Sequence, residues 1–346
     1  MNQQDNRNLE IDGESDNFLN QRKSDLTIDF NNDQTVFMAK SWSGFKKHVK
    51  WQFLVEYNLL KNYKNWIYIV FGLVAVYIHV IGHNLAYYVA EPREPLKDLL
   101  FEILPEVSTD SILFNMNTIL LFVMYGMMTV MILSIFFFKY PPQRRVSFIG
   151  ICNRYLYVAG IGQILRVITF LLTVLPAPNP FCREPHFDPP TKVKEIFIGN
   201  AGAGDKGCGD LIFSSHTMLG LIIIFIIHKF FGIQKYEYIL KNSKDIEIIS
   251  RSRENVYRTY NDPETSSEDN SSLRSELTLF ITKKEYYLRW FILILFVLVL
   301  LFDFVCILLS RKHYTVDIVV AIYTTFFIWY IVDKNHTDPK IPNIKA

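Results

Sequence analysis

The stretch Trp290-Phe-Ile-Leu-Ile-Leu-Phe-Val-Leu-Val-Leu-Leu-Phe-Asp-Phe-Val-Cys-Ile-Leu-Leu309 decides the fold, because Asp303 is its only charged residue. A helix needs about 20 predominantly apolar residues to cross the hydrocarbon core of a bilayer, so this block predicts a transmembrane helix. Comparable blocks recur along the chain, and we place six predicted spans near 66–89, 112–138, 155–175, 211–232, 290–310 and 314–332. The expected fold class is therefore an all-α, polytopic membrane protein with six transmembrane helices.

The composition of the 346-residue chain agrees with this class, since 50% of its residues are hydrophobic and 28 are Phe. Long apolar blocks of this kind are not typical of a soluble domain. The formal net charge of +2 at pH 7 does not favour a nucleic-acid-binding protein. Four Cys exclude a dense disulfide scaffold, although one disulfide remains possible.

The connections between the spans predict the orientation of the chain in the membrane. Lys and Arg concentrate in 139–154 and 233–289, whereas acidic residues outnumber basic ones in 90–111 and 176–210. Because basic loops stay on the cytosolic side, both termini should be cytosolic. The acidic connections and the short turn at 311–313 should then lie on the lumenal or extracellular face.

The polar segments predict the domain organisation. Residues 1–65 are rich in polar residues, and we expect a cytosolic and disordered region. Residues 66–332 should form the transmembrane domain, with a flexible cytosolic insert at 241–285. Residues 333–346 should form a cytosolic tail. The first apolar block begins too far from the N-terminus to be a cleavable signal peptide.

Two polar motifs stand at the edges of predicted spans. The first is Cys208-Gly-Asp-Leu-Ile-Phe-Ser-Ser-His-Thr217, and the second is His313-Tyr-Thr-Val-Asp317. The four-residue spacing of His313 and Asp317 places both on one face of a helix. The predicted topology also puts His216 and His313 at the same face of the membrane.

This combination favours transfer of a phosphoryl-type group through a covalent histidine. A neutral imidazole is a competent nucleophile, and a carboxylate one turn away holds its other ring N–H and stabilises the imidazolium. A second histidine can protonate a leaving alkoxide and then take a proton from an incoming alcohol. Ser214, Ser215 and Thr217, with backbone N–H groups at the helix start, are candidates to bind phosphate oxygens.

Two other interpretations of the histidines were weighed. A single histidine at a membrane interface is more often structural than catalytic, so the prediction rests on the pair. Zinc binding competes for His and Asp side chains, but no HExxH or CxxC motif accompanies them, and we expect no metal.

The histidine motifs resemble those of the lipid phosphate phosphatase superfamily, and the wider match is closest to its sphingomyelin synthase branch, the ceramide phosphotransferases. That branch carries C-G-D-x-x-x-S-G-H-T, which Cys208–Thr217 matches except that Ser215 replaces Gly. It also carries H-Y-T-x-D-V, which His313–Asp317 matches, with Ile318 in place of Val. Two weaker motifs are kept in part at Glu94-Pro-Leu-Lys-Asp98 and in the third span, which contains Arg166.

The resemblance implies a two-step exchange with His216, His313 and Asp317 as catalytic residues. His313 would attack the phosphorus of phosphatidylcholine or another glycerophospholipid, and ceramide would then take the head group from the phospho-histidine, releasing diacylglycerol in the first step. Asp210, Arg166 and Tyr314 would join the serines and Thr217 as substrate-binding residues. No cofactor is implied, and a homo-oligomer is possible.

The same resemblance leaves the head group open. Phosphocholine is the first expectation, with ethanolamine and inositol variants and a lipid phosphate phosphatase as alternatives. The implied location is the Golgi or the plasma membrane, with the active site on the lumenal or extracellular face.

Other polar residues were assigned from their positions alone. His79 and His83 could bind a head group, but we expect them to form hydrogen bonds between helices. Asp303 is expected either to pair with a neighbour or to reach the site. Cys182 and Cys208 share one predicted lumenal loop, where they can either form a disulfide or remain free thiols.

Overall fold

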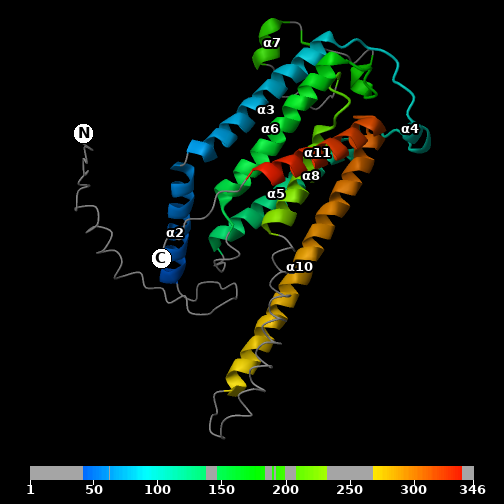
Figure 1. Ribbon diagram of the computed structural model, residues 1–346. Coiled ribbons are helices and arrows are strands. Elements are labelled where there is room, and N and C mark those ends of the chain that lie inside the picture. The colour runs from blue at the N-terminus through cyan, green and yellow to red at the C-terminus, as the bar shows by residue number, and fades with distance from the viewer. Residues whose placement is uncertain are drawn as a thin grey trace, which may run out of the picture. The chain divides into compact units, whose positions relative to one another are not determined.

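The computed structural model describes residues 42–61, 63–137, 146–183, 189–190, 192–198, 208–231 and 268–336, and the secondary structure of these residues is entirely helical (Figure 1). The elements in chain order are α2 Trp42–Lys61, α3 Tyr63–Val89, α4 Leu99–Ile103, the 3-10 helix η1 Ile112–Asn115, α5 Met116–Phe137, α6 Phe148–Leu172, the 3-10 helix η3 Pro180–Cys182, α7 Val193–Ile198, α8 Ser215–Phe230, α10 Glu268–Leu309 and α11 Thr315–Asn335.

The all-α, polytopic membrane fold is confirmed. Five helical segments within the described residues are long and apolar enough to cross a membrane, namely Trp66–Val89, Ile112–Phe137, Phe148–Leu172, Tyr287–Leu309 and Thr315–Asn335. The fourth predicted span, 211–232, forms the shorter apolar helix α8, Ser215–Phe230. A membrane crossing by α8, and with it the count of six, stays a prediction.

Helix α8 is the central helix of the bundle, since it contacts α5, α6, α10 and α11. Met218, Ile222 and Ile226 on α8 are completely buried. A Cβ added at Gly220 would lie 2.6 Å from Leu300 of α10, so the absence of a side chain lets these two helices approach closely. The four neighbours thereby hold the start of α8, which carries His216, in one position.

Helix α2 differs from the expectation that residues 1–65 are disordered, because Trp42–Lys61 is helical. Val55 and Leu59, four residues apart, are buried on one face of α2. The buried Glu56 carboxylate accepts hydrogen bonds from Ser147 Oγ at 2.8 Å and from the N–H groups of Phe148 and Ile149 at 3.0 Å.

This contact also explains why α6 begins at Phe148 rather than near 155. A helix start carries unpaired N–H groups and a partial positive charge, and the Glu56 carboxylate satisfies both. Helix α10 likewise begins at Glu268, inside the expected flexible insert, and α11 extends to Asn335. Residues before 42, the insert residues 241–267 and the tail after 336 lie outside the described residues.

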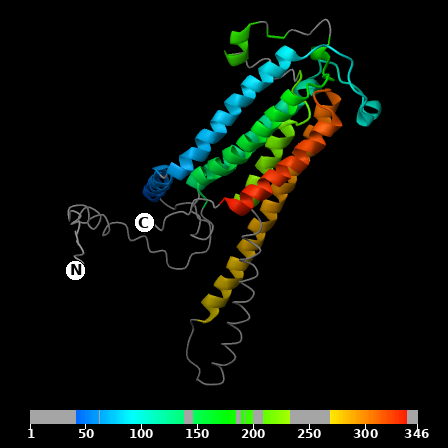
Figure 2. The same ribbon diagram turned by 45° about the horizontal axis from the view of Figure 1, so that its top comes forward.

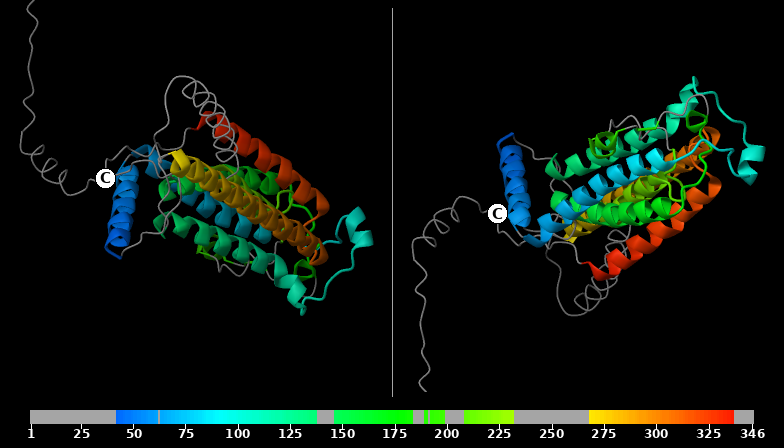
Figure 3. Two further views of the ribbon diagram at one scale, coloured as in Figure 1. Left: turned by 90° about the horizontal axis from the view of Figure 1, so that it is seen from below. Right: turned by 90° about the horizontal axis from the view of Figure 1, so that it is seen from above.

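The connecting segments gather at one end of the bundle. Figure 1 shows α4 beside the junction of α10 and α11, with α7 near the end of α3, and Figure 2 and Figure 3 show this grouping from other directions. Backbone and side-chain contacts join this end together, including the hydrogen bond from Asn84 of α3 to the Ile196 carbonyl of α7 at 3.0 Å. We call it the histidine end, because it carries His216 and His313.

Candidate active site

The turn between α10 and α11 presents His313. The N–H groups of Ser310 and Lys312 donate to the carbonyls of Cys306 and Ile307 at 3.0 and 3.2 Å, which closes the turn on the end of α10. Arg311 adopts a φ of 53°, a left-handed conformation that is uncommon for a side chain with a Cβ. This turn therefore has a defined backbone path from one helix to the next.

Arg311 is held in that conformation by α4 and the residue that follows it. Its guanidinium donates to the carbonyls of Phe101 and Leu104 at 2.9 and 2.8 Å and lies 4.0 Å from the centre of the Phe101 ring. These carbonyls close the C-terminal end of α4, where partial negative charge favours a cation. The short helix thus fixes the residue two positions before His313.

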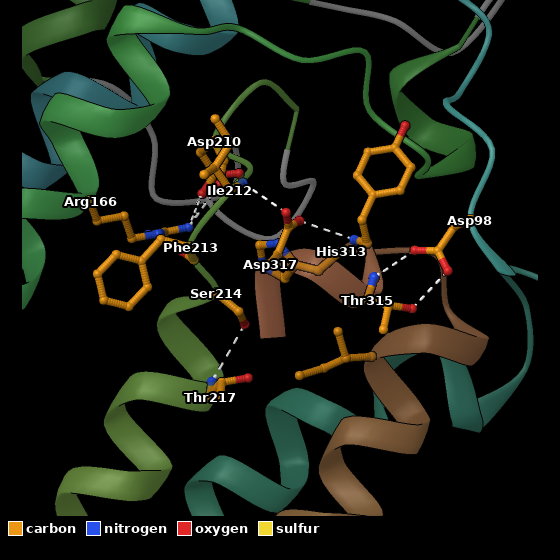
Figure 4. Close-up of polar contacts among 12 residues, drawn as sticks. Asp98, Arg166, Asp210, Ile212, Phe213, Ser214, Thr217, His313, Thr315 and Asp317 are labelled. Carbon is orange, nitrogen blue, oxygen red and sulfur yellow. Dashed lines mark hydrogen bonds and ion pairs between the residues drawn. The ribbon is translucent and has the colours of Figure 1, made fainter. Parts of the chain in front are cut away.

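Asp317 joins the two histidine motifs, as Figure 4 shows. Its Oδ2 lies 3.1 Å from His313 Nδ1 and accepts from the Tyr314 N–H at 3.0 Å. Its Oδ1 accepts from the Ile212 N–H at 2.9 Å, and its side chain is completely buried. The contact expected from the spacing of His313 and Asp317 is confirmed, and it leaves His313 Nε2 as the ring nitrogen that can attack.

The loop before α8 follows a constrained path. Gly209 has a φ of +87°, and a Cβ there would lie 2.9 Å from the Ala86 carbonyl oxygen. Ile212 has a φ of 78°, which is unusual for a β-branched residue. The Ser214 N–H donates to the Asp317 carbonyl at 3.3 Å. Asp317 therefore holds both the strained residue of this loop and the residue that caps α8.

Arg166 and Asp210 form a buried ion pair with 2.5 Å between Nη2 and Oδ2 (Figure 4). Arg166 also donates to the Phe213 carbonyl at 2.5 Å and contacts His79, while His83 Nδ1 lies 3.0 Å from Asp210 Oδ2. Burial alone would raise the pKa of Asp210, but His83 and Arg166 hold it far below its usual value. Asp210 is consequently a permanent anion that anchors the loop.

These contacts show which protein groups bind the residues that were expected to contact substrate. We expect Arg166 to bind a phosphate or a carboxylate, and the structure shows its guanidinium bound to the Asp210 carboxylate and to carbonyls of the loop that precedes α8. The expected interhelical role of His79 is confirmed by its contact with Arg166, from α3 to α6. His83 instead reaches the loop through Asp210. Any phosphate contact of Arg166 or head-group contact of Asp210 stays a prediction.

The start of α8 lies beside these residues. Ser214 caps the helix and accepts from the Thr217 N–H at 3.5 Å, and Ser215 is the first helical residue. The largest electrostatic interaction of His216 with another side chain is with His313, followed by Lys312. The Thr217 hydroxyl is buried without a hydrogen-bond partner among the described residues. His216 and His313 therefore lie at the same end of the bundle, near enough for their charges to interact.

Tyr314 has a different environment from the one expected. Its hydroxyl donates to the Pro176 carbonyl and accepts from the Leu96 N–H, both at 2.8 Å. Its ring stacks on Phe101 with 5.6 Å between centroids. These bonds join the hydroxyl to two connecting loops, and a substrate contact of Tyr314 stays a prediction.

Asp98 lies at the histidine end, and the sequence assigned it no role. Its carboxylate accepts from the N–H and the hydroxyl of Thr315, both at 2.7 Å, and from the Leu100 N–H at 3.0 Å (Figure 4). Burial alone would raise the pKa of Asp98, but these donors hold it below its usual value. In the sequence, the partly kept motif Glu94–Asp98 is the feature that could have singled out Asp98.

Cys182 and Cys208 form a disulfide, which resolves the two options left open by the sequence. It ties the loop that carries Asp210 to η3. Among the residues that the structure describes, no group of three His, Cys, Asp or Glu side chains is placed to hold a metal ion.

Comparison with known proteins identifies a family whose matched segment contains the second histidine motif. Residues 275–335 match the family described as PAP2 superfamily C-terminal. This segment includes His313 and Asp317 and the helices on either side of them.

Three relatives cover larger parts of the chain. Phosphatidylinositol:ceramide inositolphosphotransferase 3 of Arabidopsis thaliana is 30% identical over 281 residues, which are 78% of this chain and 74% of the relative. Phosphatidylinositol:ceramide inositolphosphotransferase of Oryza sativa subsp. indica is 27% identical over 317 residues, 89% of this chain and 76% of the relative. Phosphatidylethanolamine:ceramide ethanolaminephosphotransferase of Trypanosoma brucei brucei (strain 927/4 GUTat10.1) is 26% identical over 175 residues, 49% and 36% respectively. The chain therefore belongs to the sphingolipid phosphotransferase family, within the lipid phosphate phosphatase superfamily.

Proposed function

We propose that this protein transfers a phospho-head group from a glycerophospholipid to the primary hydroxyl of ceramide. The observation that carries the proposal is the contact between His313 Nδ1 and the buried Asp317 carboxylate at 3.1 Å, at the same end of the bundle as His216. The names of the relatives, which pair a glycerophospholipid with ceramide, support the same two substrates.

The first half-reaction transfers the head group to the protein. His313 Nε2 attacks the phosphorus, an N–P bond forms, and the bond from phosphorus to the diacylglycerol oxygen breaks. His216 gives a proton to that oxygen, and diacylglycerol leaves. Asp317 keeps the Nδ1 proton of His313 in place and stabilises the positive charge that the ring acquires.

The second half-reaction transfers the head group to ceramide. His216, now neutral, takes the proton of the ceramide hydroxyl as its oxygen attacks the phosphorus. The N–P bond breaks, His313 is restored, and the product is a phosphosphingolipid. Ser214, Ser215, Thr217 and N–H groups at the start of α8 would receive the phosphate oxygens, because a helix start favours anions.

The names of the relatives support phosphoinositol as the transferred head group. The relatives that share most of their length with this chain carry inositol in their names, and the ethanolamine relative shares a smaller part. Phosphocholine, the first expectation from the sequence, has no counterpart among these three names. Phosphatidylinositol is therefore the first donor to test, ahead of the ethanolamine and choline lipids.

The test uses purified protein, a fluorescent ceramide and each of the three donor lipids in turn. A phosphosphingolipid should form together with diacylglycerol, and both should require ceramide and His313. Release of the head group into water at the same rate with and without ceramide would instead show a hydrolase. Full activity of a His313→Ala variant would remove the histidine from the reaction.

A further inference from the structure

A second buried polar cluster lies beside the catalytic pair, and the proposed reaction does not yet use it. Lys312, next to His313, donates from Nζ to Asn117 Oδ1 at 3.0 Å. The same Nζ lies 5.1 Å from the centre of the Phe114 ring. Asp303 of α10 interacts electrostatically with Lys312. We call Asn117, Asp303 and Lys312 the polar cluster.

The polar cluster is assembled from three separate segments. Asn117 stands at the start of α5, Asp303 lies within about two turns of the end of α10, and Lys312 is in the turn before α11. Exposed fractions of 0%, 2% and 5% for these residues show that all three are buried. The Lys312 charge also acts on His216. The polar cluster and the histidines therefore belong to one end of the bundle.

Two atoms of the polar cluster have no hydrogen-bond partner among the described residues. They are Asn117 Nδ2, a donor, and Asp303 Oδ1, an acceptor. Leaving a buried polar atom unpaired costs about 1–3 kcal/mol, and more when the group is charged. Both atoms can therefore bond to a polar molecule, and such bonds would remove this cost.

We propose that the polar cluster is the subsite for the donor head group, and that it is built for a polyhydroxylated ring such as inositol. Lys312 neutralises the phosphate, while Asn117 Nδ2 and Asp303 Oδ1 bond to ring hydroxyls as donor and acceptor. This proposal rests on the proposed function and names the residues that select its donor.

The Phe114 ring supports this choice over a choline head group. A quaternary ammonium is recognised by the faces of aromatic rings. In the structure, the protein's own Lys312 already lies over the Phe114 ring, and a second cation beside Lys312 would be repelled. Ring hydroxyls need no aromatic face and carry no charge. Each can donate to Asp303 and accept from Asn117.

Two substitutions test the subsite in the full-length protein. Asp303→Asn keeps the shape of the side chain but replaces one acceptor oxygen with an amide donor, and Asn117→Leu removes the amide donor while suiting an apolar helix. Transfer to ceramide is measured with phosphatidylinositol and with phosphatidylethanolamine, whose head group carries no hydroxyl. Each variant should lower kcat/KM for phosphatidylinositol by about 10- to 100-fold, while KM for ceramide stays unchanged.

The ratio of the two donors separates recognition from stability. It should fall in both variants and remain at the wild-type value in Asp333→Asn, the same change at the opposite end of α11. An unchanged ratio in active Asp303→Asn and Asn117→Leu variants would overturn the subsite and leave the proposed function standing. Equal losses with both donors, together with a lower Tm, would also overturn it. No transfer from any donor by the wild-type protein would overturn the proposed function itself.

Discussion

At the scale of single residues, Asp317 connects the parts of the site. One oxygen faces His313 and the Tyr314 N–H, and the other accepts from Ile212 of the loop before α8. The side chain is completely buried, so it orients the imidazole in an environment of low dielectric constant, where its charge acts strongly. The position of one carboxylate therefore determines the tautomer of His313, the proposed nucleophile, and the path of the loop that leads to His216.

Replacing Asp317 with Asn should abolish most of the activity. The amide matches the carboxylate in shape but not in charge, so it cannot stabilise the imidazolium of His313, and we expect kcat to fall about 10²- to 10⁴-fold. The matched control is Asp333→Asn on the same helix, which should retain wild-type kcat. Transfer to fluorescent ceramide measures both, and near-normal kcat in Asp317→Asn with an intact fold would contradict the assigned role.

His216 can be tested against a second histidine of the same helix. His216→Ala should lower kcat by about 10²- to 10⁴-fold, because it removes the proton donor to the leaving diacylglycerol. His228→Ala lies near the other end of α8 and should leave kcat unchanged. Equal rates for the two variants in the ceramide assay would exclude His216 as the acid and base.

At the scale of elements, short helices and loops fix the ends of the long helices. Asp98 caps α4 and binds the first residue of α11, and Arg311 binds carbonyls at the end of α4. At the other end, Glu56 of α2 binds the start of α6. The long helices bury apolar surface, which is non-directional, so these directional contacts determine where each helix begins.

The Asp98 contacts predict a pH dependence of stability. Because the folded protein holds the pKa of Asp98 below its usual value, the stabilisation is complete above the unfolded pKa of about 4. It is lost as the pH falls toward the folded pKa. Thermal unfolding should show a lower Tm for Asp98→Asn than for wild type at pH 7, with the difference shrinking at pH 4. A difference that stays constant over this range would contradict the assignment.

At the scale of the whole molecule, the chain places His216, His313 and Asp317 at one end of an apolar bundle. α8 lies among α5, α6, α10 and α11, and the Ser214 N–H at its start donates to the Asp317 carbonyl in the first turn of α11. Large apolar side chains on the outer helices are exposed, as the surface of a membrane protein requires; examples are Leu172 at 80% and Phe122 at 70%. Two-tailed lipid substrates can therefore approach the histidine end from the bilayer.

We predict that the bundle lies in the membrane with its histidine end in the lumen of the Golgi or outside the cell. In sealed vesicles whose cytosolic face points outward, an impermeant maleimide should label Lys334→Cys directly and Glu106→Cys only after detergent. Both side chains are exposed, and they lie at opposite ends of α11 and its neighbours. The opposite labelling pattern, or a glycan on Asn335, would reverse the orientation.

The sequence by itself determined the membrane fold and the contact between His313 and Asp317. Hydropathy of a block and spacing along one turn are local properties, so each could be predicted without knowing how the chain packs. The boundaries of α6 and the helical state of α2 could not, because both depend on Glu56 reaching residues 91 to 93 positions away in the chain.

Only the tertiary structure decided which residues share the site. It paired Arg166 with Asp210 and used the Tyr314 hydroxyl to join two loops, and neither partner could be named from the sequence. It also brought Asn117 to Lys312 across 195 positions. A polar side chain in an apolar bundle must bond to the nearest available partner, and that partner is set by helix packing rather than by distance along the chain.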